Sequence, residues 1–119
     1  MKILVSYSYL FDLLFAEFKV QKQKERYLTD SIKNNHRLYI SALTLHEIYN
    51  QCSFEAIEEL SIQFDILTEE ILPFTETISK LEKNYRKADS NLSLEKATAS
   101  VYGLDKILTP DGLVSIVGI

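Results

Sequence analysis

The sequence predicts one α/β domain over residues 1–119, a three-layer sandwich with helices covering both faces of a central, mostly parallel sheet of four or five strands. Two observations favour this fold. Short apolar segments alternate along the chain with longer amphipathic ones, which is the order of strands joined by helical crossovers. The chain also has only three glycines and two prolines, too few for the many turns of an all-β protein.

The first third of the chain predicts two strands with helices between them. Residues 2–6 are short and apolar, as in a buried strand. Apolar residues then recur at helical spacing over 10–20, and the charged stretch 19–35 continues as a second helix. Residues 37–41 (RLYIS) form the second strand.

The middle of the chain predicts two helices and a third strand. Ser41 or Thr44 can cap a helix through 45–51, because a serine or threonine hydroxyl accepts a hydrogen bond from a free N–H of the first turn. A second helix follows over 54–63, and 64–69 (FDILTE) is expected to be a short strand.

The last third predicts two more helices and the end of the sheet. Residues 74–87 form an amphipathic helix, and 92–103 form another, with Gly103 placed to end it. Residues 105–112 supply a fourth strand with its turn, and the apolar residues 113–119 a closing strand.

In a parallel sheet, side chains that follow the carboxyl ends of the strands meet at one edge, where ligands bind. Ser6 follows the first strand, Glu47 lies on the helix after the second, and Thr109 and Asp111 follow the fourth. Two carboxylates from separate strands can share a divalent cation through oxygen ligands. Hydrolysis with two metal ions would need more carboxylates than these two.

The charge distribution allows one basic surface on an acidic protein. The formal net charge is -4, but residues 19–37 contain six Lys or Arg and two Asp or Glu, a local excess of +4. Lys22, Lys24 and Arg26 in this stretch are candidates for contacts with RNA phosphates. A solvated helix face explains the same residues, and we favour that interpretation.

Several classes of protein are disfavoured. A single cysteine, Cys52, rules out an internal disulfide and a cysteine-based zinc site, and two histidines are few for a histidine-rich metal site. No apolar run approaches the roughly 18 residues of a membrane span, and no signal peptide is recognisable. We therefore expect a cytoplasmic protein with no small-molecule cofactor.

Three stretches, MKILVSYSYLFDLLF (1–15), ISALTLHEIYN (40–50) and ATASVYGLDKILTPD (97–111), resemble in order and spacing the segments of PIN-domain proteins. These are small α/β ribonucleases, many of them toxins of bacterial and archaeal toxin–antitoxin pairs. The resemblance covers essentially the whole chain. It implies about four acidic residues around one or two Mg²⁺ or Mn²⁺ ions in active members.

By position, the resemblance assigns the acid of the middle motif to Glu47 and the acid of the last motif to Asp111, with Thr109 beside it. The aspartate that ends the first strand in the family is replaced by Ser6. A serine hydroxyl is a neutral and weak ligand for a hard cation.

The fourth family acid should open the helix of the last motif. Leu92, or Ser93 with a shift of one residue, occupies that position, and neither is acidic. Asp89 lies three residues earlier and is the nearest candidate to replace it.

The leading hypothesis is a degenerate PIN-like domain with weak or no nuclease activity, acting as a protein- or RNA-binding module. The alternative is an active Mg²⁺- or Mn²⁺-dependent ribonuclease of the toxin–antitoxin type, using Glu47, Asp111 and Asp89. A protein partner or a homodimer is expected, and Phe11, Phe15, Phe18 and Tyr27 are apolar material for such contacts unless the core takes them up.

Overall fold

The computed structural model describes residues 1–88 and 92–116. In them, five strands form one sheet in the order β3-β2-β1-β4-β5. Strands β1 to β4 are parallel, and β5 is antiparallel to β4. Their bounds are β1 Lys2–Val5, β2 Arg37–Ser41, β3 Glu70–Leu72, β4 Lys106–Thr109 and β5 Gly112–Ser115.

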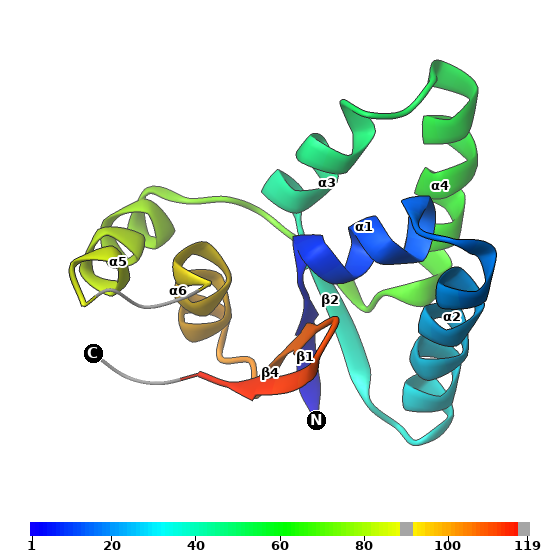
Figure 1. The fold of residues 1–119 in the computed structure, drawn as a ribbon. Coiled ribbons are helices and arrows are strands. Elements are labelled where there is room, and N and C mark those ends of the chain that lie inside the picture. Colours follow the sequence, from blue (N-terminus) through cyan, green and yellow to red (C-terminus); the bar gives the residue numbers. More distant parts are fainter. Residues whose placement is uncertain (89–91, 117–119) are drawn as a thin grey trace.

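The helices cover both faces of the sheet. Their bounds are α1 Tyr7–Phe15, α2 Phe18–Lys33, α3 Ala42–Tyr49, α4 Phe54–Leu67, α5 Glu76–Lys87 and α6 Ser93–Tyr102. Figure 1 shows α1 to α4 on one side of the sheet and α5 and α6 on the other. The predicted three-layer α/β/α sandwich with a mostly parallel sheet is confirmed.

Alternating strand residues build the two halves of the core. Ile3 and Val5 of β1 face the cluster under α1 to α4, whereas Leu4 between them faces the cluster under α6. Successive side chains of a strand point to opposite faces, so a strand covered on both sides is apolar at every position. All three residues are 1% exposed, which explains why β1 has no polar residue after Lys2.

Serine and threonine caps set where four of the helices begin. Ser6, Ser41, Ser53 and Thr75 each precede a helix and accept a hydrogen bond from a first-turn N–H through the side-chain oxygen. These bonds satisfy donors that have no partner inside the helix. At the other end of α6, Gly103 adopts a φ of 68°, the left-handed conformation that glycine tolerates, and ends the helix as predicted.

The prediction of a strand over 64–69 is wrong. Helix α4 continues through Leu67, and β3 begins only at Glu70. Phe64 is 3% exposed and lies in the same core cluster that Leu60 and Leu67 contact, so helical periodicity persists past the predicted boundary. The extended Thr68 ends the helix.

Other boundaries shift by smaller amounts. The first helix starts at Tyr7 rather than near residue 10, and α5 starts at Glu76, because Ser6 and Thr75 act as the caps. The predicted closing strand is shorter, since β5 ends at Ser115, and residues 117–119 lie outside the described part of the chain. In the described residues, no helix combines the length and apolar character needed to cross a membrane.

Candidate functional site

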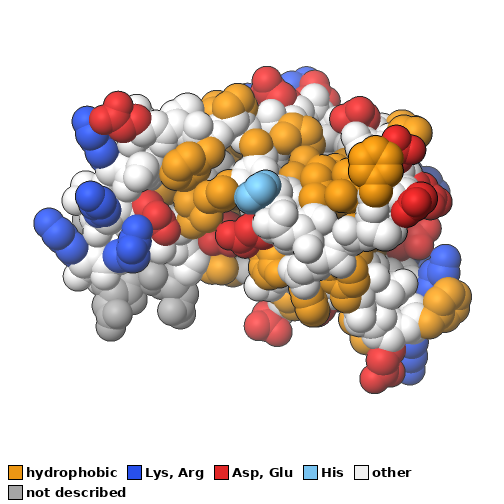
Figure 2. Space-filling model, turned by 90° about the horizontal axis from the view of Figure 1, so that it is seen from above, with side chains coloured by type: hydrophobic (Ala, Val, Ile, Leu, Met, Phe, Trp, Pro, Cys, Tyr) orange, Lys and Arg blue, Asp and Glu red, His pale blue; other side chains and the backbone are white. Residues whose placement is uncertain are grey.

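The strand order places a switch point between β1 and β4. The connections from β1 to β2 and from β2 to β3 lie on one face, and α5 and α6 return the chain on the other face to β4 (Figure 1). In open α/β sheets, ligands bind beyond the carboxyl ends of the strands at such a point. Figure 2 looks down on this edge and shows acidic side chains at a hollow between the α5–α6 side and the rest of the molecule.

Ser6 lies at the centre of this edge and has a structural role there. Its side chain is fully buried, and its Oγ accepts a hydrogen bond from the N–H of Tyr9 at 3.2 Å. Its own N–H donates to the carbonyl of Leu108 at 3.0 Å and ties β1 to β4. The hydroxyl is therefore engaged in capping α1 at the position where the resemblance implies a metal-binding aspartate.

Glu47 reaches the same edge from α3. The cap at Ser41 starts this helix directly at the end of β2, and the carboxylate of Glu47 is exposed. Gln51, one turn later, donates to the hydroxyl of Tyr7 at 2.6 Å and so links α3 to the start of α1. Glu47 is thereby held on the side of the edge next to β1.

Glu95 in the first turn of α6 is an acidic group that the sequence analysis missed. Desolvation by burial raises the pKa of its carboxyl, and the negative charges of Glu47 and Glu82 raise it further. Hydrogen bonding from the backbone N–H groups of Glu95 itself and of Tyr7 acts in the opposite direction and lowers the pKa. Glu95 thus lies within electrostatic reach of Glu47 and beside the residue that follows Ser6.

A signal in the sequence could have found Glu95. Leu92 occupies the position expected for the fourth acid, and residues three apart lie on the same face of a helix. An acid at Glu95 therefore reaches the same side of α6 one turn later. It is also in the first turn, where a carboxylate is stabilised by free N–H groups, so it has a structural role as well.

Neither Leu92 nor Asp89 supplies the expected fourth acid among the described residues. Leu92 has a φ of 58°, a left-handed conformation, and contacts the core cluster that contains Leu4 and Ile107. It is an apolar residue at the start of α6 and provides no ligand. Asp89, the candidate replacement, lies outside the described residues.

Glu82 is occupied by structural contacts. Arg86 donates to its carboxylate at 3.0 Å, and the Ser93 hydroxyl donates at 3.4 Å. The second bond joins α5 to the start of α6. Glu82 therefore anchors the helix that carries Glu95 and adds negative charge near it.

Asp111 and Thr109 lie in the tight turn between β4 and β5. The Thr109 hydroxyl donates to the carbonyl of Gly112 at 2.9 Å and accepts from the N–H of Asp111 at 3.3 Å. Gly112 has a φ of 123°, which a side chain would strain. Thr109 holds the turn together, and the carboxylate of Asp111 is exposed.

A small hollow of about 300 Å³ lies beside this turn, lined by residues that include Tyr9, Lys24, Tyr27 and Asp111. The Lys24 ammonium donates to the carbonyl of Pro110 at 3.1 Å and lies 5.1 Å from the centre of the Tyr9 ring. Lys24, one of the candidate RNA contacts, is therefore half-buried and already engaged.

The other two candidate RNA contacts lie on the outer face of α2. Lys22 pairs with Glu25 at 3.4 Å and lies 5.2 Å from the centre of the Phe18 ring, and Arg26 is exposed. An exposed pair of this kind contributes little to stability. Both cations remain accessible from solvent.

The chemistry that these groups can perform is limited. In residues 1–88 and 92–116, no three His, Cys, Asp or Glu side chains are arranged so that they could hold a metal ion. Glu47 and Glu95 lie near enough to influence each other electrostatically, which makes a pair rather than a group of three. Ca²⁺ and Mg²⁺ take about six or more oxygen ligands, so a pair would leave most positions to water or to substrate phosphates.

Comparisons with known proteins give a likeness in structure only. No family model matches the chain, and no curated protein matches its sequence. Its structure is similar to a chain in the crystal structure of VapBC2 from Rickettsia felis, which was solved bound to a DNA fragment from the VapBC2 promoter. The TM-score is 0.55 at 12% identity, over 92% of this chain and 86% of that chain. At this identity the likeness shows the fold alone, which agrees with the PIN-like sandwich expected from the sequence.

Proposed function

We propose that the chain is a PIN-like domain with weak or no nuclease activity that works as a binding module. The observation that carries this proposal is Ser6. At the centre of the edge the chain has a buried hydroxyl engaged in a helix cap, in place of a carboxylate free to bind a cation. Without that negative oxygen, a hard divalent ion loses its most central ligand.

Two further observations support a protein as the bound partner. Many of the PIN-domain proteins that the sequence resembles act with an antitoxin, and the structural neighbour is named as the VapBC2 complex. The aromatic residues of the N-terminal half are also exposed rather than taken up by the core: Phe11, Phe15, Phe18 and Tyr27 are 38%, 40%, 73% and 42% exposed. Exposed aromatic side chains are typical of protein interfaces.

An RNA-cleavage assay tests the proposal. Purified protein is incubated with structured and single-stranded RNA in the presence of Mn²⁺, Mg²⁺ or a chelator. We expect no cleavage above that of a Glu47→Gln/Glu95→Gln variant prepared in parallel. Cleavage that requires the metal and disappears in this variant would overturn the proposal.

The second candidate function is an active Mg²⁺- or Mn²⁺-dependent ribonuclease. The proximity of Glu95 to Glu47 favours it, because these two acids, Asp111 and Asp89 together would equal the number of acids that the family uses. Activity lost separately in Glu95→Gln and in Asp111→Asn would support this candidate. Exposed Glu69, changed to Gln, is the matched control and should have no effect.

RNA binding without cleavage is tested separately. Lys22→Gln/Arg26→Gln removes two accessible cations of α2, whereas Lys80→Gln/Lys83→Gln removes two from α5 on the other side of the sheet. Weaker and less salt-dependent RNA binding in the first variant only would assign RNA to α2. RNA binding that is equal in both variants would place the RNA elsewhere on the molecule, and no RNA binding by the wild type would leave a protein as the partner.

A further inference from the structure

Helix α1 carries a row of three aromatic rings on one face. Tyr7, Phe11 and Phe15 follow the spacing i, i+4 and i+8, which places them on the same side of a helix. The ring centres of Tyr7 and Phe11 are 6.1 Å apart, and those of Phe11 and Phe15 are 5.1 Å apart. Phe11 and Phe15 are 38% and 40% exposed, so part of each ring faces solvent. We refer to these three residues as the aromatic row.

A recess of about 330 Å³ opens beside this row. It is lined by Tyr7, Ser8, Phe11 and Asp12 of α1 and by Pro110 of the β4–β5 turn. Its volume is at the lower end of the range for small-ligand sites, which is about 300–1,000 Å³. The recess therefore fits one long side chain or a ligand of similar size.

The Asp12 carboxylate in this recess has no partner within the described part of the chain. Its side chain is half-buried, and residues 1–88 and 92–116 supply neither a hydrogen bond nor an ion pair to it. A partly buried carboxylate without a partner is costly, because it loses hydration without a compensating interaction. A cation bound in the recess would offset this cost.

The charges around the recess also favour a cation. The backbone N–H of Tyr7 hydrogen-bonds to the carboxylate of Glu95, and Glu95 lies within electrostatic reach of Glu47. From α2, the ammonium of Lys24 donates to the carbonyl of Pro110 and is engaged there. Helix α1 itself contains no Lys or Arg. Among the described residues, acidic groups therefore outnumber basic groups around the recess.

An organic cation suits the recess better than a metal ion. Ca²⁺ and Mg²⁺ take about six or more oxygen ligands, whereas the recess offers the one carboxylate of Asp12. Aromatic rings attract ammonium and guanidinium groups to their faces. A guanidinium fits better than an ammonium, because it is planar, stacks on rings and makes paired hydrogen bonds to a carboxylate.

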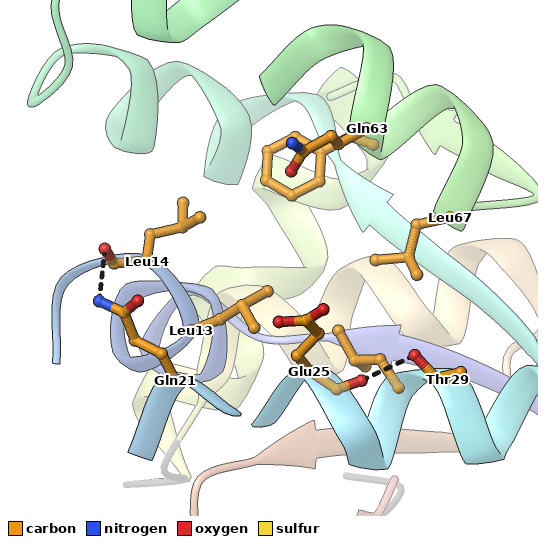
Figure 3. Close-up of a pocket in the computed structure, with 9 residues that line it drawn as sticks. Leu13, Leu14, Gln21, Glu25, Thr29, Gln63 and Leu67 are labelled. Atoms are coloured by element: carbon orange, nitrogen blue, oxygen red, sulfur yellow. Dashed lines mark hydrogen bonds between the residues drawn. The ribbon is translucent and has the colours of Figure 1, made fainter. Parts of the chain in front are cut away.

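The larger groove between α1, α2 and α4 lacks these features. Figure 3 looks into this groove of about 370 Å³, with Leu13 and Leu14 from α1 and Leu67 from α4 around it. Among the described residues, Glu25 is the one charged residue that lines it, and its carboxylate is 3.4 Å from the ammonium of Lys22. Because that carboxylate is already paired, the groove has no free charge to select a cation.

We propose that the recess on α1 binds an arginine side chain of a partner protein, with the guanidinium on the Asp12 carboxylate and against the ring of Phe11. This inference rests on the proposed function, since it names how the binding module recognises its partner. A protein fits better than a free guanidinium compound, because the aromatic row continues past the recess to Phe15 and offers apolar contact to residues beside the arginine. RNA is a poorer occupant, because α1 has no basic residue and the nearby carboxylates repel phosphates.

NMR titration of the isotope-labelled full chain tests the proposal with defined probes. The probes are a short capped peptide with arginine followed by leucine, the same peptide with citrulline in place of arginine, and arginine amide. We expect the arginine peptide to shift the amide signals of Tyr7, Phe11 and Asp12 in a saturable way. Citrulline has a similar shape without the charge and should cause no such shift. Arginine amide should act on the same signals but bind more weakly, since it does not reach Phe15.

Two substitutions test the carboxylate and the ring. Asp12→Asn should weaken binding of the arginine peptide by about fivefold or more, because it removes the charge and keeps the size. Asp30→Asn, at an exposed position of α2, is its matched control and should leave binding unchanged. Phe11→Leu should weaken binding by about twofold to fivefold, because an aliphatic side chain does not attract a cation. Phe54→Leu, at an exposed ring of α4, should have no effect.

Four results would overturn the proposal. The first two are the absence of a saturable shift with the arginine peptide and equal binding of the citrulline peptide. An equal effect of Asp12→Asn and Asp30→Asn would place the cation elsewhere. Equal affinity of the peptide and of arginine amide would assign the recess to a small cation rather than to a protein. The RNA-cleavage assay is independent of these results, so failure here would leave the proposed function standing.

Discussion

At the scale of single residues, Ser6 and Glu95 set how many acidic groups lie at the carboxyl edge of the sheet. Ser6 caps α1 from a fully buried position, and Glu95 is an acid in a partly desolvated site near Glu47. The first position lacks an acid that the resemblance implies, and the second has an acid that the resemblance does not predict. Adding an acid at Ser6 and removing the acid at Glu95 test these two differences separately.

Ser6→Asp is expected to give the edge a third carboxylate near Glu47 and Glu95. Aspartate is as good an N-cap as serine, so the start of α1 is preserved. Without metal, the variant should be less stable because of repulsion among the acids, and Mn²⁺ should raise its melting temperature more than that of the wild type. Ser6→Asn is the uncharged control. An equal Mn²⁺ effect in the Asp and Asn variants would contradict the expectation.

Glu95→Gln is expected to stabilise the fold at neutral pH. Burial and nearby charges raise the pKa of Glu95 in the folded state above its ordinary value. The folded protein therefore binds this proton more tightly than the unfolded chain does, and the wild type loses stability as pH rises through this raised pKa. The gain in melting temperature should be present at pH 7 and should shrink toward zero below the ordinary glutamate pKa of about 4.3. A gain in melting temperature that stays constant with pH would contradict this expectation.

At the scale of elements, caps at strand ends set the positions of the candidate site residues. Ser41 ends β2 and caps α3 in the same residue, so Glu47 lies on the second turn after the strand. Of the two predicted caps, Ser41 and Thr44, the structure shows Ser41. Its Oγ accepts a hydrogen bond from the N–H of Thr44 at 3.1 Å. The position of Glu47 depends directly on this bond.

Ser41→Ala is expected to cost about 1 kcal/mol of unfolding free energy, because the N–H of Thr44 loses its acceptor in a buried place. Urea denaturation measures the loss. Ser8→Ala, at an exposed position within α1, is the matched control and should change stability by less than about 0.5 kcal/mol. Equal effects of the two substitutions would mean that the cap contributes nothing.

At the scale of the whole molecule, burial separates apolar residues that stabilise the fold from apolar residues that face solvent. Ile40 is 0% exposed in β2, whereas Ile62 is 64% exposed on α4. The two side chains are identical, so their environments alone distinguish them. Their truncation therefore separates the contribution of a core residue to stability from that of a surface residue.

Ile40→Ala is expected to destabilise the monomer by about 2–5 kcal/mol, the usual cost of such a cavity in a core. Ile62→Ala should change the unfolding free energy of the monomer by less than about 0.5 kcal/mol. Chemical denaturation at dilute protein concentration measures both. A large loss for Ile62→Ala under these conditions would mean that its side chain is covered within the monomer.

The sequence by itself determined the fold class and most of the elements. The apolar runs at 2–6 and 37–41 are buried on both sides of a sheet, and such strands show as short stretches with hardly a polar residue. It did not determine the end of α4, where Phe64 fits a helix and a strand equally well in a local window. Only contact of Phe64 with the core decided between them.

The candidate site also has a part that the sequence proposes and a part that only the tertiary structure shows. Motif position proposed Glu47, Thr109 and Asp111 as candidates and placed Ser6 where the resemblance implies an acid. These assignments stay predictions. The position of Glu95 one turn after Leu92 was visible in the sequence, but its nearness to Glu47 was not, since that joins α6 to α3 across the edge of the sheet. Local sequence specifies which residues a helix exposes, but tertiary structure decides which distant residues meet.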